Sequence, residues 1–213
     1  MSGDFDFEPV KGLPQVLPAG ERLLWQGSPR WQDLALHAFH ARKVALYFLG
    51  LAALQGAVRL LNGSGLEQAA RPFLWLIPLG LVAAGILTGL AYASARTTVY
   101  TMTSKRIVMR IGIALPITLN LPFRLVDAAS VRLFANGAGD VPLKLHTGER
   151  LAYMILWPHA RPLFFSEPQP TLRAIPDADR VANLLAFALA GLPAQAIPPA
   201  PAALSYPAAA VAA

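Results

Sequence analysis

Two long apolar stretches dominate the hydrophobic pattern of this chain, and one short polar segment separates them. The first stretch covers residues 44–61 and the second covers residues 73–95. At a rise of about 1.5 Å per residue, helices over these ranges are roughly 27 and 34 Å long, enough to cross a hydrocarbon core of about 30 Å. The pattern therefore predicts a transmembrane hairpin over residues 44–95, with the segments before and after it in the same compartment.

Behind the hairpin, the periodicity changes from helical to alternating. Six segments alternate apolar and polar positions and predict strands: 97–102, 106–111, 113–119, 123–133, 141–146 and 151–157. A later apolar stripe predicts one amphipathic helix, with Asp177 as its N-cap and Gly191 after its end. Several antiparallel strands followed by one C-terminal helix is the layout of a pleckstrin-homology-like β-barrel or sheet.

The segment in front of the hairpin predicts a short strand over 22–26. Ser28 has the position of an N-cap before an interfacial helix over 29–42. The predicted fold class is therefore an α+β membrane protein with four parts. They are an N-terminal segment with an interfacial helix (1–43), the transmembrane hairpin (44–95), a pleckstrin-homology-like domain (96–191) and a disordered alanine–proline tail (192–213).

Basic residues flank the hairpin mainly on one side. Three precede the first stretch and four follow the second: Arg30, Arg42, Lys43, Arg96, Lys105, Arg106 and Arg110. The connection over 62–72 holds one basic residue, Arg71. The positive-inside rule therefore predicts that both termini are cytoplasmic. The net charge of +6 comes mostly from residues 96–180, which favours contact with anionic lipid over contact with nucleic acid.

Small residues recur at four-residue intervals in both apolar stretches. They are Ala52 and Gly56 in the first stretch, and Gly85, Gly89 and Ala93 in the second. This spacing lets helix backbones approach closely. Packing of the two helices within one hairpin and formation of a homodimer both fit the pattern.

The sequence offers little chemistry for catalysis. The chain has no cysteine, which excludes disulfides, thiolate nucleophiles and thiolate metal sites. It contains no phosphate loop, dinucleotide fingerprint or Gly-x-Ser-x-Gly motif. The carboxylates Asp127, Asp140 and Glu149 are isolated in sequence. We therefore expect no enzyme, no cofactor and no metal site.

Three groups of residues are candidates for binding. His37 and His40 lie three apart on the predicted interfacial helix, where they could face one pigment ligand or simply contact headgroups and backbone carbonyls. The basic cluster Lys105, Arg106 and Arg110 is either an anionic-lipid site or a topology signal. The segment 157–162 is stiff, aromatic and basic, which suits either a loop that docks a partner or a rigid connection.

Several runs are specific enough to compare with known families. They include Leu23-Leu24-Trp25-Gln26-Gly27, Asn120-Leu121-Pro122-Phe123-Arg124, Gly139-Asp140-Val141-Pro142-Leu143 and Leu156-Trp157-Pro158-His159-Ala160-Arg161-Pro162. Together with matches across residues 6–190, they resemble the PuhB family of photosynthetic complex assembly proteins of purple bacteria. One departure is Ser104-Lys105, where the family pattern leads us to expect asparagine and arginine.

The resemblance implies a non-enzymatic assembly factor in the bacterial inner (cytoplasmic or intracytoplasmic) membrane. Its implied partners are subunits of the reaction centre and the core light-harvesting antenna, together with membrane lipids. The expected partner-binding residues are Trp157, His159, Arg161, Phe123 and Arg124, and the basic cluster is expected to face lipid. Two alternatives are a bacteriochlorophyll carrier that uses His40 or His37 and a general lipid-binding membrane module.

Overall fold

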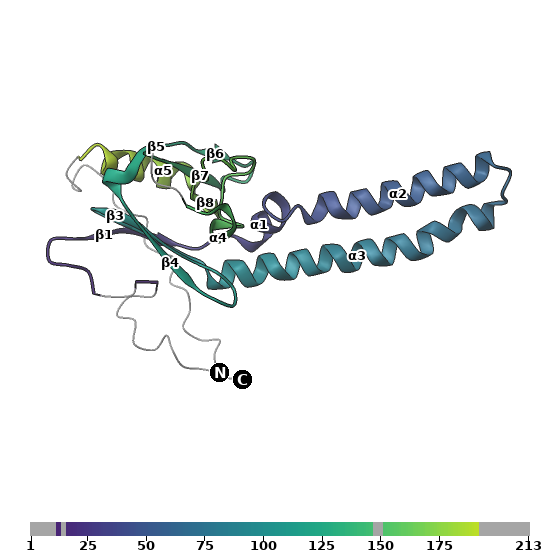
Figure 1. Cartoon of the computed structure of the whole chain (residues 1–213), viewed down its shortest axis with the longest axis horizontal. Helices are drawn as coiled ribbons and strands as arrows, with labels where there is room; N and C mark the ends of the chain where they lie inside the picture. The colour runs from purple at the N-terminus through teal and green to yellow at the C-terminus, as the bar shows by residue number, and fades with distance from the viewer. Residues whose placement is uncertain (1–11, 14–15, 147–150, 192–213) are drawn as a thin grey trace, which may run out of the picture.

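The computed structural model of the chain consists of a globular head and a long helical hairpin that projects from it (Figure 1). It describes residues 12–13, 16–146 and 151–191. The hairpin is formed by α2 (Ala41–Leu61) and α3 (Leu66–Thr97), whose mean hydropathies are 1.7 and 2.1. Both helices are long and apolar enough to span a membrane. The predicted tail over 192–213 lies outside the described residues.

The third helix is longer than the sequence pattern indicated. Its 32 residues correspond to about 48 Å, so roughly a third of its length exceeds a hydrocarbon core of about 30 Å. Compared with the predicted stretch 73–95, the helix starts seven residues earlier and ends two residues later, and near its C-terminal end Leu87, Ala91 and Ala95 pack against α1 (Trp31–His37). The last turns of α3 therefore belong to the head, and the helix joins the two parts without an intervening loop.

The prediction of one interfacial helix over 29–42 is wrong. Helix α1 ends at His37, and α2 begins at Ala41. Between them His40 adopts a left-handed conformation with φ of 56°, which breaks the helical path. The N-cap of α1 is Arg30 rather than Ser28. Leu34, Ala35 and Phe39 are buried against α3, so tertiary packing sets this break.

Four antiparallel strands form the first sheet of the head, in the order β1-β2-β3-β4. Their bounds are β1 Leu23–Gly27, β2 Val99–Thr103, β3 Arg106–Ile111 and β4 Ile117–Pro122. Strand β1 precedes the hairpin and pairs with β2, which follows it. The segments on the two sides of the hairpin are therefore parts of one sheet.

The second sheet is centred on β7 (Gly139–Leu145), which pairs with three short strands. They are β5 (Val126–Ala129), β6 (Arg132–Leu133) and β8 (Thr171–Ile175). The single strand expected over 123–133 is instead a short 3-10 helix η1 (Phe123–Leu125), β5 and β6. The strand expected over 151–157 is wrong, because Tyr153–Leu156 form the short helix α4. No pattern in the sequence predicted β8.

The main core lies between the two sheets and α5 (Ala178–Leu189). Val181, Leu184 and Leu185 of α5 are buried in it, which confirms the predicted stripe. Asp177 precedes the helix as predicted, although its side chain makes no capping hydrogen bond. Two apolar helices followed by a sheet-rich domain with a C-terminal helix match the predicted fold class.

Close packing within the hairpin involves fewer small residues than the pattern suggested. Gly56 is buried, and a Cβ atom there would lie 2.9 Å from the carbonyl oxygen of Ala69. Gly80 packs in the same way against Phe48. In contrast, a Cβ atom at Gly85 or Gly89 would meet nothing within 4 Å. The two helices therefore approach through Gly56 and Gly80.

Candidate functional site

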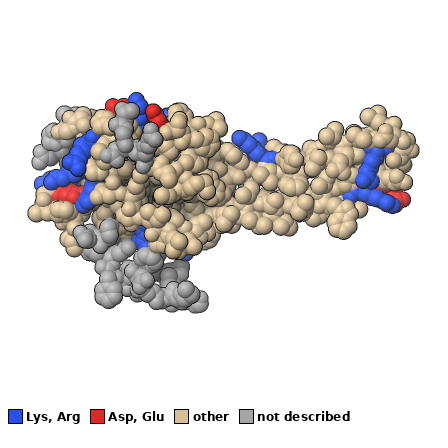
Figure 2. All heavy atoms as spheres, in the orientation of Figure 1, with Lys and Arg blue, Asp and Glu red and all other residues tan. Residues whose placement is uncertain are grey.

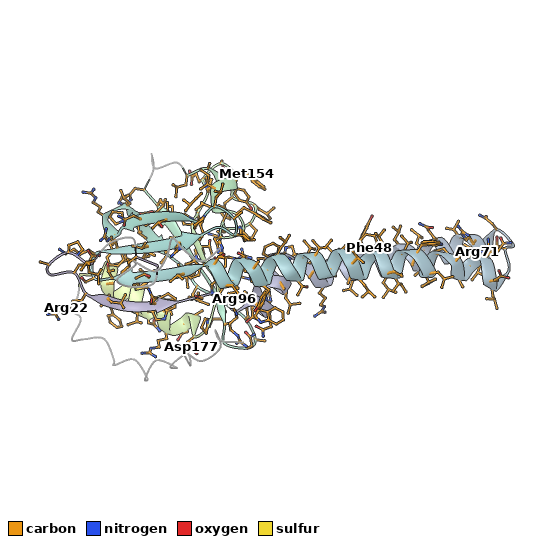
Figure 3. All side chains as sticks on the ribbon, turned by 90° about the horizontal axis from the view of Figure 1, so that it is seen from below. Arg22, Phe48, Arg71, Arg96, Met154 and Asp177 are labelled. Carbon is orange, nitrogen blue, oxygen red and sulfur yellow. The ribbon has the colours of Figure 1, made fainter. Side chains whose placement is uncertain are left out.

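The tip of the β2–β3 turn lies at the end of the head farthest from the hairpin. The amide of Ser104 in this turn donates to the carbonyl of Arg22 at 2.9 Å. Arg22 and Arg71, which lies beside the tip of the hairpin, occupy opposite ends of the molecule (Figure 3). Lys105 and Arg106 are therefore remote from the hairpin, and a head anchored by that hairpin would hold them away from its bilayer, so their anionic-lipid role stays a prediction.

Phe123 and Arg124 lie at this same far end. The amide of Phe123 donates to the carbonyl of Lys105 at 3.0 Å, and Arg124 is exposed. We call the exposed residues Arg22, Lys105 and Arg124, together with the half-buried Phe123, the distal basic surface. Figure 2 shows lysine and arginine side chains gathered at this end of the head. Two of the predicted partner-binding residues are thus joined with a residue that was predicted to bind lipid.

Arg106 is held by an ion pair within the head. Its Nε and Nη2 donate to the two carboxylate oxygens of Glu21 at 2.8 and 3.1 Å. Burial alone would raise the pKa of Glu21. Hydrogen bonds from Thr103 and Arg106 have the larger combined effect, so the pKa of Glu21 lies below its usual value. Arg106 therefore fixes the segment before β1 onto the sheet and contributes less charge to the surface than Lys105.

Arg110 is separated from the other two members of the predicted basic cluster. It stands opposite Val99, which lies two residues after the end of α3, whereas Arg106 stands opposite Pro122 at the far end of the sheet. The strand β3 thus places Arg106 and Arg110 at its two ends. The three residues therefore do not form the compact cluster that their spacing in sequence suggests, because most of the length of a strand separates Arg110 from the other two.

A buried polar network joins the head to the last turn of α3. The imidazole of His159 is fully buried, with Nδ1 2.6 Å from the hydroxyl of Tyr100. Its Nε2 lies 3.2 Å from Oγ1 of Thr98 and 3.4 Å from Oγ of Ser94. Burial, followed by repulsion from Arg173, lowers the pKa of His159 to about 3. His159 therefore has no exposed surface for a partner, and its predicted role in partner binding is wrong.

Arg173 in β8 extends this network. Its Nε lies 3.4 Å from Oδ1 of Asp140, and that oxygen also accepts the amide proton of Ala174 at 2.9 Å. The guanidinium donates to the carbonyls of Ala160 and, at the end of α1, His37. The pair of Arg173 and Asp140 was not predicted from the sequence. The only hint in the sequence is that Arg173 lies within a short apolar run. An arginine exposed on the surface would give the same pattern.

The two remaining predicted partner residues lie close to the hairpin. Trp157 is 51% exposed and meets Phe39 edge-on, with ring centroids 5.3 Å apart. The guanidinium of Arg161 stacks over Phe164 at 4.1 Å and donates to Gln169 Oε1. Trp157 and Arg161 therefore form a second group, separate from the distal basic surface.

The two histidines proposed as pigment ligands do not share a helix face. His37 stacks on Phe134 with ring centroids 3.8 Å apart, and its Nδ1 lies 3.0 Å from the carbonyl oxygen of Asp33. His40 lies in the break between α1 and α2. The prediction that they face one ligand from one helix is wrong. Among the described residues, no group of three histidines or carboxylates has the arrangement of a metal site.

Comparison with known proteins identifies the family. The chain belongs to the bacterial PH domain family, whose model matches residues 44–188 and so includes the hairpin as well as the head. A protein of Rhodobacter capsulatus, described as an uncharacterized 23.7 kDa protein in the 5′ region of puhA, is 40% identical over 187 residues. The match covers 87% of each chain. No solved structure matches this chain.

Proposed function

We propose that this chain is a non-enzymatic assembly factor for the photosynthetic reaction centre and its core light-harvesting antenna. The observation that carries the proposal is the relative from the 5′ region of puhA, which matches 87% of this chain at 40% identity. The resemblance of the sequence to the PuhB family supports the same role. A homologue over nearly its whole length in that gene region favours a photosynthetic role over a general lipid-binding module.

The architecture suits a tethered binding protein. The apolar parts of α2 and α3 lie between basic residues at the base and at the tip of the hairpin (Figure 2), which supports a membrane-spanning hairpin. In the proposed orientation the head lies on the cytoplasmic side of the bacterial inner membrane. Confinement to the membrane raises its effective concentration near newly inserted subunits.

The distal basic surface is the proposed contact for a partner. Arg22, Lys105 and Arg124 are exposed at the end of the head that points away from the bilayer. Such a cluster fits an acidic cytoplasmic segment of a reaction-centre or antenna subunit, because complementary charges steer association. Phe123, half-buried beside them, supplies an apolar element at the same place.

The test is co-purification from photosynthetically grown membranes, with a tag on the full chain and a detergent that preserves the complexes. The wild-type chain should retain reaction-centre or antenna polypeptides. The double variant Lys105→Glu/Arg124→Glu should lose most of them, because it reverses two charges of the distal basic surface. Arg132→Glu is the control for a charge reversal elsewhere on the head, because Arg132 is an exposed arginine on β6 in the other sheet.

Two results would contradict the proposal. One is the absence of photosynthetic polypeptides from the wild-type sample while the intact complexes are still present in the extract. The other is equal loss with the double variant and with Arg132→Glu, which would show that no particular surface is used. A chromosomal deletion gives an independent readout, since it should lower the amount of assembled complex.

A further inference from the structure

Exposed apolar side chains gather on the head where the hairpin emerges. They belong to α4 and to the segment that follows it, and Met154 and Leu163 are 82% and 83% exposed. We call this group the proximal apolar surface: Met154, Ile155, Trp157, Leu163, Phe164 and Phe165. Figure 1 places α4 beside α1 at the base of the hairpin, and Figure 3 places Met154 on the hairpin side of the head.

Direct contacts fix this surface to the start of the hairpin. The indole of Trp157 meets the ring of Phe39, which lies two residues before the first residue of α2. Phe165 packs on Tyr153 of α4 with ring centroids 4.7 Å apart, which joins the later segment to the helix. The proximal apolar surface is therefore placed at the level where α2 begins its apolar run.

The distribution of charged residues on and beside this surface is the one expected at the boundary between hydrocarbon and lipid headgroups. Residues 151–166 contain one charged side chain, Arg161, and its guanidinium is stacked on Phe164 and bonded to Gln169. Arg42 and Lys43 are exposed at the first turn of α2, where lipid headgroups would lie. Tryptophan is enriched at this level of membrane proteins, which suits Trp157.

The backbone also holds one of these side chains outward. Leu163 adopts a φ of 68°, a conformation that is unfavourable for leucine and that suits glycine or asparagine. Because Leu163 is exposed, packing within the head does not offset the cost of this backbone conformation. Burial of the Leu163 side chain against another molecule would offset this cost and explain why leucine is exposed here.

We propose that the proximal apolar surface inserts into the interfacial region of the same bilayer that the hairpin spans. The part of the head that contacts lipid is thus the uncharged proximal apolar surface around α4, and the basic β2–β3 turn points away from lipid. The insertion fixes the tilt of the head and directs the distal basic surface into the cytoplasm. The proposal requires that the hairpin spans the membrane, but it does not require the proposed assembly role.

Site-directed spin labelling of the full chain tests the proposal, because the natural sequence has no cysteine. Single variants Met154→Cys and Leu163→Cys report on the surface. Leu79→Cys in α3 is the control for the bilayer, and Leu23→Cys is the control for water, because Leu23 is exposed and pairs with Thr103 at the far end of the head. Each labelled protein is placed in nanodiscs of phosphatidylcholine and phosphatidylglycerol, and collision with oxygen is compared with collision with a water-soluble nickel chelate.

The labels at 154 and 163 should collide several-fold more with oxygen than with the nickel chelate, as the label at 79 does, and the label at 23 should show the reverse. Labels at 154 and 163 that behave like the label at 23 would overturn the proposal. Low collision with both reagents at 154 and 163 would also overturn it, because another protein or a second copy would then cover the surface. None of these readouts needs a photosynthetic partner, so the result is independent of the assembly role.

Discussion

The hydroxyl of Tyr100 lies 2.6 Å from Nδ1 of His159, although 59 residues separate the two in sequence. The same hydroxyl accepts the backbone N–H of Arg173 at 3.1 Å, so its own proton is directed to the imidazole. This assigns the N–H of His159 to Nε2, which faces Thr98 at the end of α3. The neutral ring therefore links the spanning helix, the first sheet and β8.

Because it must stay neutral, His159 should make the head less stable in mild acid. Burial lowers its pKa from the usual 6.5 of a histidine to about 3. Between these values the unfolded chain binds a proton that the folded chain excludes, so the stabilising contribution is complete above about pH 6.5 and is lost as the pH falls toward 3. The slope from this residue is at most about 1.4 kcal/mol per pH unit.

Thermal unfolding of the full chain in detergent micelles between pH 4 and 8 checks this expectation. The variant His159→Gln should be less stable than the wild type at neutral pH, because it loses the fitted ring. It should also lose part of the dependence on pH between about 6.5 and 5, where the carboxylates are still ionised. Parallel curves for the two proteins would rule out a neutral buried His159.

Removal of Arg173 should destabilise the head strongly. The substitution Arg173→Met leaves the buried carboxylate of Asp140 without its ion-pair partner and removes the bonds to Ala160 and His37. Breaking a buried pair on one side costs about 3–5 kcal/mol. The double variant Arg173→Met/Asp140→Asn should recover part of this loss, because no unpaired buried charge remains. Denaturant titration of the single and double variants measures the difference, and strictly additive losses would contradict the pairing.

The main helices could be predicted because each has a strong period or a long apolar run. The hairpin and α5 were identified from these signals, although α2 and α3 begin at Ala41 and Leu66, before the predicted positions 44 and 73. The run over 151–157 is a short apolar segment, and such segments fit a strand or a helix equally well. Strand β8 was missed because it lies between Pro170 and Pro176 and contains an arginine.

The candidate site was harder to predict, because the course and pairing of the strands decide which of its residues lie together in space. The sequence places Lys105, Arg106 and Arg110 close together, but β3 carries Arg106 and Arg110 to opposite ends of the sheet. The burial of His159 depends on Tyr100 and Thr98, about 60 residues earlier. Neither relation has a local signal, since both depend on the register of strands that are distant in sequence.

Both segments that flank the hairpin should be found on one side of the membrane. Strand β1 pairs with β2, so a folded head cannot have residues 23–27 and 99–103 in different compartments. Alkaline phosphatase inserted after Ser64, in the connection between α2 and α3, should be active in the periplasm. The same reporter fused after Gly191 should be inactive. Activity from the fusion after Gly191 would reverse the proposed orientation.

The two helices of the hairpin should tolerate bulk at Gly85 but not at Gly56. A side chain at Gly56 would meet the carbonyl of Ala69 and the ring of Phe73, whereas Gly85 has nothing within 4 Å. Gly56→Leu should therefore cost about 1–3 kcal/mol through overpacking. Gly85→Leu should be neutral or slightly stabilising, because leucine favours helix more than glycine does.

Thermal unfolding in micelles compares the two leucine variants under the same conditions. For a chain of this size, each kcal/mol lowers the unfolding midpoint by roughly 2–4 °C. A drop for Gly56→Leu with no change for Gly85→Leu shows that the hairpin closes through the Gly56 face. A drop for Gly85→Leu that depends on protein concentration would instead show that the Gly85 face joins two chains, because dissociation makes the midpoint depend on concentration. The same pair of variants thus separates the two interpretations of the small-residue pattern, packing within one hairpin and association between chains.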